Sequence, residues 1–186
     1  MKPESRFTSP TELCPHPERW CSEDDQATEL QVMELVAAFV RALQPDYVLE
    51  TGTHLGYCAE KIGVALEENE KGELTSIEID GERACKARER CSGLPVEIIC
   101  CSSLIWSPPP GTVIDFAWLD SGGGSLRIEE FWRFRQYFRR GAIIGIHDTA
   151  PHQGNIRALV DVTGEDVSIR YIHLPTPRGV SFLEVM

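Results

Sequence analysis

The sequence lacks any long apolar run and has few basic residues. Its longest unbroken apolar stretch covers residues 35–40, far short of the roughly 18 residues that a membrane-spanning helix needs. The N-terminus shows no apolar stretch of signal-peptide length. Lysine and arginine total 18 against 29 acidic residues, and the net charge is −11. Nucleic-acid and anionic-membrane surfaces require clustered basic side chains. We therefore expect a cytoplasmic protein with neither kind of partner.

Paired cysteine motifs are also missing. The seven cysteines are an odd number and show no Cys-x-x-Cys spacing, which favours reduced thiols over a disulfide framework. Cys14, His16 and Cys21 resemble part of a zinc site, but their spacing is poor and no fourth ligand stands near them. We therefore favour no zinc site here.

Apolar strands alternate with amphipathic helices along most of the chain. A length of 186 residues suits one domain, which we place at residues 22–186 after an irregular arm at 1–21. A first helix is predicted from residue 22 to Pro45. Strands are predicted at 47–50, 74–79, 96–100, 113–119, 141–146, 167–174 and 180–185, and further helices at 55–66, 82–91, 125–138 and 155–162.

This alternation predicts a Rossmann-like α/β fold, which is a doubly wound sheet of about seven strands with an additional N-terminal helix. The strands are mostly parallel because helices connect them. No helix separates the last two predicted strands, so they can pair as a hairpin at the sheet edge, with the last strand antiparallel.

A glycine-rich turn follows the first predicted strand, in the order Glu50-x-Gly52-x-x-x-Gly56. Glycine lets the backbone approach a ligand closely at such a strand-to-helix turn. The spacing differs from the dinucleotide fingerprint Gly-x-Gly-x-x-Gly. The acid at Glu50 would repel a pyrophosphate and would suit a cationic group such as an amino acid's ammonium.

A second acid ends the next predicted strand. Glu78 at that position can accept two hydrogen bonds from a ribose diol. Asp80 is the second choice for this role, although its place before Gly81 also suits a helix N-cap.

Together these segments resemble the Rossmann-fold S-adenosylmethionine (SAM)-dependent O-methyltransferases, in particular the compact family of macrocin-type sugar O-methyltransferases. The resemblance covers residues 20–186. It implies SAM as cofactor, the ribose on Glu78, and the adenine beside the segment after the third strand. The cofactor-binding residues that it implies are Glu50, Gly52, Thr53, His54, Gly56, Tyr57, Glu78, Ile79, Ser102, Ser103 and Asp120.

The catalytic candidates are Asp120, His147 and Asp148, which follow the fourth and fifth predicted strands. O-methylation needs an acceptor hydroxyl that a divalent metal such as Mg²⁺ or a general base activates. Asp120 and Asp148 match the acids of metal-dependent relatives. Thr149 stands where those relatives have asparagine, so His152 or Gln153 would have to complete the coordination. The alternative to a metal is His147 as general base.

The segment before the first strand folds over the active site in similar proteins. Here Trp20, Thr28 and Glu29 are the candidates for closing the pocket. The alternative for Trp20 is that it anchors the arm to the surface.

The sequence therefore predicts methyl transfer from SAM to an oxygen of a small-molecule acceptor, by a protein that can form a homo-oligomer. Two alternatives stay open, namely a metal-dependent hydroxylase-like enzyme of the same fold and a non-catalytic cofactor-binding module. A nicotinamide-dependent oxidoreductase ranks last because of the glycine spacing.

Overall fold

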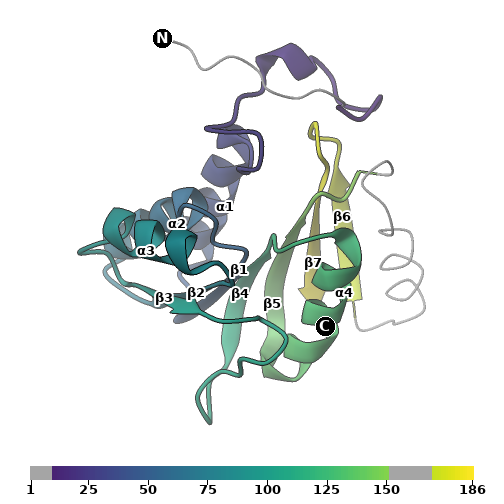
Figure 1. Ribbon diagram of the computed structural model, residues 1–186. Helices are drawn as coiled ribbons and strands as arrows, with labels where there is room; N and C mark the ends of the chain where they lie inside the picture. Colours follow the sequence, from purple (N-terminus) through teal and green to yellow (C-terminus); the bar gives the residue numbers. More distant parts are fainter. Residues whose placement is uncertain (1–9, 151–168) are drawn as a thin grey trace.

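A computed structural model describes residues 10–150 and 169–186. Within them, one sheet contains seven strands in the order β3-β2-β1-β4-β5-β7-β6 (Figure 1). The strands are β1 (Tyr47–Thr51), β2 (Glu73–Glu78), β3 (Val96–Cys100), β4 (Ile114–Leu119), β5 (Phe138–His147), β6 (Ile169–Leu174) and β7 (Val180–Val185).

The strand directions match the predicted doubly wound fold. β1 to β5 pair in parallel, while β7 pairs antiparallel with both β5 and β6. The predicted terminal hairpin and antiparallel last strand are therefore confirmed. The parallel strands all present their carboxyl ends at one edge of the sheet, where ligands bind in open α/β folds.

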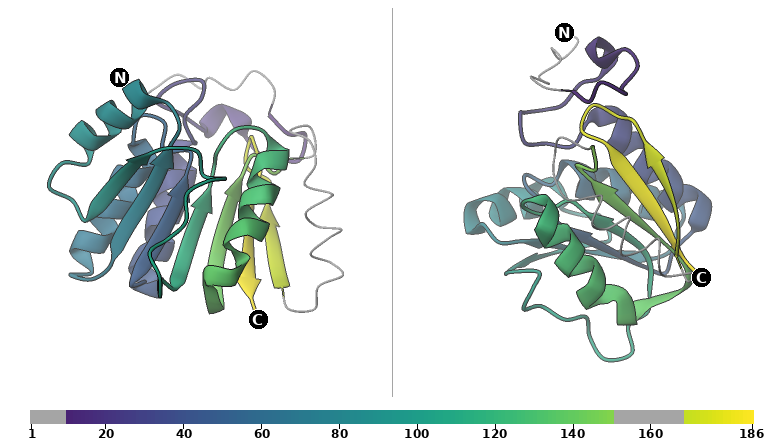
Figure 2. Two further views of the ribbon diagram at one scale, coloured as in Figure 1. Left: turned by 60° about the horizontal axis from the view of Figure 1, so that its bottom comes forward. Right: turned by 90° about the vertical axis from the view of Figure 1, so that its right-hand side faces the viewer.

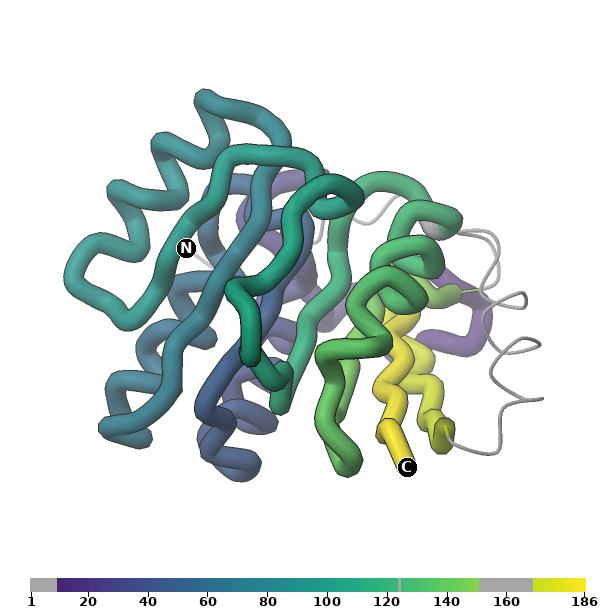
Figure 3. Tube along the Cα trace, turned by 90° about the horizontal axis from the view of Figure 1, so that it is seen from below, coloured from purple at the N-terminus to yellow at the C-terminus, as the bar shows by residue number. Residues whose placement is uncertain are grey.

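Helices cover both faces of the sheet (Figures 1 and 3). α1 (Leu30–Leu43), α2 (Tyr57–Glu68) and α3 (Gly81–Arg90) pack on one face, and α4 (Gly124–Phe134) packs on the other. Two short 3-10 turns, η1 (Pro17–Arg19) and η2 (Arg135–Tyr137), complete the described elements. Among the described residues, no helix combines the length and apolar character of a membrane span.

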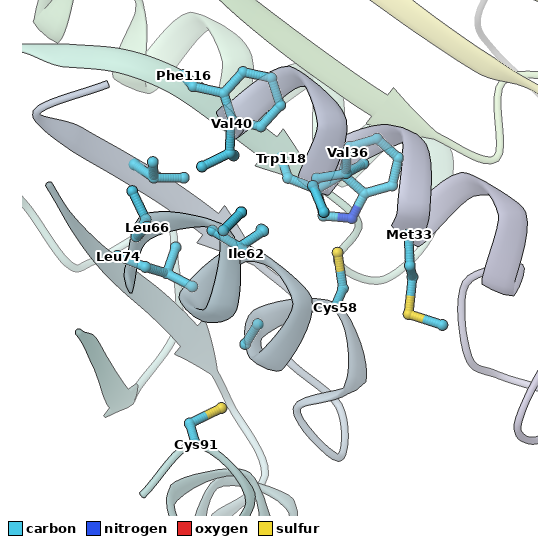
Figure 4. Packing of buried hydrophobic residues seen from close by; sticks show 14 of the residues in the cluster. Met33, Val36, Val40, Cys58, Ile62, Leu66, Leu74, Cys91, Phe116 and Trp118 are labelled. Carbon is cyan, nitrogen blue, oxygen red and sulfur yellow. The ribbon is translucent and has the colours of Figure 1, made fainter. Parts of the chain in front are cut away.

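The core is split into two layers because neighbouring strand residues point to opposite faces. Val48 lies in the layer under α1–α3, whereas Leu49 lies in the layer under α4. Figure 4 shows the first layer, in which Val40 and Ile62 lie beside Phe116 and Trp118. Each layer thus buries one apolar face of the sheet.

The first helix begins later than the sequence predicted. α1 starts at Leu30, and residues 22–29 form an irregular segment that we call the covering segment. Asp24 accepts hydrogen bonds from the backbone N–H groups of Gln26 and Ala27 (2.8 and 2.7 Å). The acids after Ser22 therefore stabilise a turn, which local aspartate hydrogen bonds favour over a helix.

The predicted helix at 125–138 was also too long. α4 ends at Phe134, and Phe138 already begins β5. Phe138 still packs in the same layer as Phe131 and Phe134, so its spacing reflected burial rather than helical continuation. The predicted helix at 155–162 and the start of the strand predicted at 167–174 lie outside the described residues.

Gly145 of β5 provides a test of the packing in the first layer. A Cβ atom there would lie 2.6 Å from Trp118 Cε3 and 2.9 Å from Phe182 Cε1, on the two strands that flank β5. We expect Gly145→Ala to lower the free energy of unfolding by about 1–3 kcal/mol through overpacking. Denaturant unfolding measures the change.

Gly81→Ala is the matched control, because a Cβ there meets only Cys100 Sγ at 3.9 Å. It lies in the first turn of α3, where alanine is a better helix former than glycine. Equal losses in both variants would show that Trp118 does not limit the space at Gly145.

Candidate functional site

A cavity of about 450 Å³ opens at the carboxyl edge of the parallel strands. Its size falls within the range of small-molecule sites. Ten of the predicted site residues line it: Gly52, Thr53, His54, Tyr57, Glu78, Ile79, Ser102, Ser103, Asp120 and Asp148. Glu50, Gly56 and His147 are not on its wall. The topology thus brings five separate chain segments to one hollow.

The glycine-rich turn lies against the end of β4. Gly52 has φ +80°, and a Cβ there would come within 2.4 Å of the Asp120 carbonyl oxygen. Its N–H donates to the Ile77 carbonyl (2.9 Å). Only glycine fits both the positive φ of residue 52 and its close approach to the Asp120 backbone. The turn therefore packs directly against the end of β4.

Glu78 presents a carboxylate to the cavity in a fixed orientation. Its Oε2 accepts from the His54 N–H (2.7 Å) and its Oε1 from the Asp80 N–H (2.9 Å). Each oxygen keeps a second lone pair for a ligand hydroxyl. Asp80 instead caps α3 by accepting from the N–H groups of Glu82 and Arg83, and it does not line the cavity.

Glu50 lies behind the wall rather than on it. It is buried, and Ser76 Oγ donates to its Oε2 (2.5 Å). Burial raises the pKa of Glu50 to about 8, which favours the neutral acid near neutral pH. A direct contact between Glu50 and a ligand ammonium group stays a prediction.

His54 links the turn to the covering segment. Its Nε2 lies 2.9 Å from Asp24 Oδ2, and its Nδ1 has no partner among the described residues. The residue has φ +53°, a conformation that costs energy in a non-glycine residue. From this position His54 both lines the cavity and contacts Asp24 of the covering segment.

The covering segment forms one side of the cavity, through Asp25, Gln26, Ala27 and Thr28. It crosses the end of the sheet near the turn that joins β6 and β7 (Figure 2). Thr28 lines the cavity, and its role in closing an active site stays a prediction. Trp20 does not line the cavity, and it packs against the core layer under α1–α3.

An ionic network forms part of the cavity wall and extends behind it to His147 and Glu29. His147 has no exposed surface, and its Nδ1 and Nε2 lie 3.0 Å from Asp120 Oδ1 and 2.5 Å from Glu29 Oε2. Asp120 Oδ2 accepts from Thr28 Oγ1 (2.6 Å). The covering segment is therefore tied to the ends of β4 and β5 by two buried side chains.

Two arginines complete this network. Arg178 donates two hydrogen bonds to Asp148, from Nε to Oδ1 (2.5 Å) and from Nη2 to Oδ2 (2.8 Å). Arg127 Nη2 donates to Asp148 Oδ2 (2.8 Å) and Asp120 Oδ1 (3.2 Å). Three carboxylates thus meet three cationic groups, which is how proteins keep buried charges.

This arrangement does not support His147 as the general base. Burial alone would lower the pKa of His147, but the negative charges of Asp120 and Glu29 raise it to about 10. The same contacts lower the pKa of Asp120 against the effect of its burial. An imidazolium enclosed by carboxylates has no free nitrogen to accept a proton, so His147 orients its neighbours.

The acids do not fit a divalent metal as they stand. Ligand atoms of Asp120, His147 and Asp148 lie within 4.8 Å of one another, which is a suitable spread. Both oxygens of Asp148 and Oδ1 of Asp120 already accept from arginine side chains. The remaining oxygen, Asp120 Oδ2, accepts one hydrogen bond from Thr28 Oγ1. The two oxygens that a bridging ion would share, Asp120 Oδ1 and Asp148 Oδ2, each accept from Arg127 and from a second cationic side chain, so both of their lone pairs are used.

Sequence reasoning missed Arg127, Arg178 and Glu130. Buried Glu130 accepts hydrogen bonds from the hydroxyls of Thr51, Ser103 and Ser121, and its burial raises its pKa. Arg127 lies in the first turn of α4, the helix that follows Asp120. This position beside a strand end could have indicated that its side chain reaches the site. Arg178 stands between a proline and a glycine in the turn before β7, and no local pattern there indicates an ion pair with Asp148.

The charge of His147 is directly measurable. Because the folded-state pKa of about 10 lies above the ordinary value of 6.5, folding takes up a proton. The stabilisation is complete below pH ~6.5 and is lost as pH rises toward 10. We expect the ¹⁵N shifts of the His147 ring to show an imidazolium at neutral pH.

His173 is the internal control, because its burial lowers its pKa and its ring should therefore be neutral at the same pH. A neutral His147 ring under these conditions would contradict the charge assignment. Denaturant unfolding should in addition show stability falling above neutral pH.

No family model matches the sequence, and neither does any curated protein. Solved structures do match the fold. The O-methyltransferase TomG from Streptomyces achromogenes, involved in tomaymycin synthesis and in complex with SAM, is 20% identical with a TM-score of 0.73 over 87% of this chain and 82% of that one.

Two further structures match similarly. The O-methyltransferase from Bacillus cereus in complex with SAH is 15% identical with a TM-score of 0.74, over 88% of this chain and 84% of that one. Cofactor-bound Rv0187 from MTB is 18% identical with a TM-score of 0.75, over 87% and 83%. The chain therefore has the fold of SAM-dependent O-methyltransferases.

Proposed function

We propose that this protein transfers a methyl group from SAM to an oxygen of a small molecule. The observation that carries the proposal is the carboxylate of Glu78, fixed at the cavity beside the glycine turn at Gly52. Structures of the same fold hold SAM or SAH. The dinucleotide spacing is absent, which favours SAM over a nicotinamide cofactor.

Different residues on the cofactor side of the cavity would meet the ribose, the adenine and the methionine portion of SAM. Glu78 would accept hydrogen bonds from the ribose hydroxyls, as acids at this strand end do. Ile79, whose side chain is 73% exposed, and Ser103 would flank the adenine. The backbone of the turn at Gly52 would meet the methionine portion. Bound SAM would supply its electrophilic sulfonium methyl group: the S–CH3 bond breaks as the acceptor's O–CH3 bond forms, SAH is the leaving group, and the hydroxyl proton of the acceptor is released to solvent.

The acceptor side is formed by charged groups and the covering segment. Asp120 and Arg127 line the cavity together with Thr28. Residues 25–28 cover one side, and they would exclude water from a bound acceptor. Asp120 would orient the acceptor hydroxyl through its charge, because its ordered carboxylate lies at the end of β4.

We also propose a cytoplasmic location and a small-molecule acceptor, without a nucleic-acid or membrane partner. All seven cysteines are unpaired, which is in keeping with a reducing compartment. The net charge of −11 supports the absence of a nucleic-acid partner. A homo-oligomer stays a proposal that sedimentation would test.

Calorimetric titration tests the cofactor directly. We expect SAM and SAH to bind at micromolar concentrations in the presence of a chelator. NADH should not bind, because the pyrophosphate fingerprint is absent. Absence of binding by both SAM and SAH would contradict the proposed function.

Glu78→Gln tests the ribose contact. Loss of charge-assisted hydrogen bonds should weaken SAH binding by roughly 1.5–3 kcal/mol, or at least about tenfold in Kd. Asp80→Asn is the matched control, because Asp80 lies outside the cavity and asparagine still caps a helix. Equal affinities of Glu78→Gln and wild type would remove Glu78 from the ribose site.

A further inference from the structure

The acids at the ends of β4 and β5 form the group in the described part of the chain that resembles a metal site. Ligand atoms of Asp120, His147 and Asp148 lie within 4.8 Å of one another. Magnesium and manganese prefer carboxylate oxygens with free lone pairs. Whether this group binds a cation therefore depends on what already occupies those oxygens.

Arg127 lies between the two carboxylates. A single nitrogen, Nη2, is 3.2 Å from Asp120 Oδ1 and 2.8 Å from Asp148 Oδ2. An ion that bridged the same oxygens would have to lie about 2.0–2.6 Å from each. It would therefore overlap the space of the guanidinium and would meet its positive charge.

The remaining contacts close the site further. Arg178 holds Asp148 with two parallel hydrogen bonds, a strong geometry for a carboxylate. His147 places its two ring nitrogens against Asp120 and Glu29. A ring between two carboxylate acceptors donates from both nitrogens, and it then has no lone pair for a metal.

Burial fixes these groups in place. Arg127 is 4% exposed and Asp148 is 6% exposed, so neither side chain can swing into solvent without leaving a buried charge behind. Removing one partner of such a pair is costly because the other stays desolvated. The Arg127 guanidinium therefore stays between Asp120 and Asp148 in the folded protein.

We infer that Arg127 takes the position that a bridging divalent cation would need, and that this acidic cluster works without a metal. As a statement about how an acceptor is activated, the inference rests on the proposed function. The positive charge beside the acceptor then comes from the protein. Arg127 acts as a positioning residue, because its hydrogen bonds fix the carboxylates of Asp120 and Asp148 relative to each other.

Mn²⁺ binding tests this inference separately from catalysis. We expect calorimetry and the electron paramagnetic resonance of free Mn²⁺ to show no binding to wild-type protein that depends on Asp120. Arg127→Met should remove one donor from each of Asp120 Oδ1 and Asp148 Oδ2 together with the positive charge between them, and the variant should bind Mn²⁺ at least about tenfold more tightly than wild type. Adding Asp120→Asn to that variant should remove the gain.

Arg133→Met is the matched control. Arg133 lies on the same helix, α4, but donates to the Trp106 carbonyl and the Ser107 hydroxyl rather than to an acid. This variant should behave like wild type. Any Mn²⁺ binding that Asp120→Asn leaves unchanged lies elsewhere on the acidic surface and supports the inference.

Two results would overturn it. The first is wild-type Mn²⁺ binding that Asp120→Asn abolishes, a comparison that stands even if Arg127→Met does not fold. The second is an Arg127→Met variant that folds, as circular dichroism would show, but gains no affinity. SAH binding to wild type in chelator is measured in parallel, and its failure would count against the proposed function alone.

Discussion

Buried carboxylates at the ends of β4 and β5 require positive charges beside them, and this requirement brings together side chains from several elements. Glu29 and Asp148 are buried carboxylates and the Asp120 side chain is only 11% exposed, and such charges persist only when cations and hydrogen bonds satisfy them. The cations come from α4, β5 and the turn before β7. The network therefore adds polar contacts between the covering segment, α4, the ends of β4 and β5 and the turn before β7, of which α4, β4, β5 and β7 also pack together in the apolar core.

The network also joins the cofactor side of the cavity to the acceptor side. Asp120 lies on the cavity wall and at the same time contacts His147, Arg127 and Thr28. The backbone of Asp120 lies directly against Gly52. The glycine turn and the covering segment therefore both contact Asp120, the acid after β4.

Local sequence signals sufficed for the parts of the site that follow strand ends. Gly52, Glu78 and Asp120 each end a predictable strand, and parallel topology brings them to one edge. The pairing of His147 with Glu29 spans 118 residues and that of Arg178 with Asp148 spans 30, and no local pattern encodes such distances. The late start of α1 was missed for a related reason. The acids after Ser22 suit a helix start, but Asp24 is held by His54 and by its own turn.

The position of Arg178 in the chain has a consequence for the order in which the site can assemble during synthesis. Arg178 closes the network from the turn between β6 and β7, 30 residues after Asp148. The ribosome therefore makes β4, α4 and β5, with Arg127 and Asp148, before it makes Arg178. The two-pronged ion pair of Asp148 can form only after the turn before β7 has been synthesised, so the acceptor side of the cavity is completed after the parallel part of the sheet has been made.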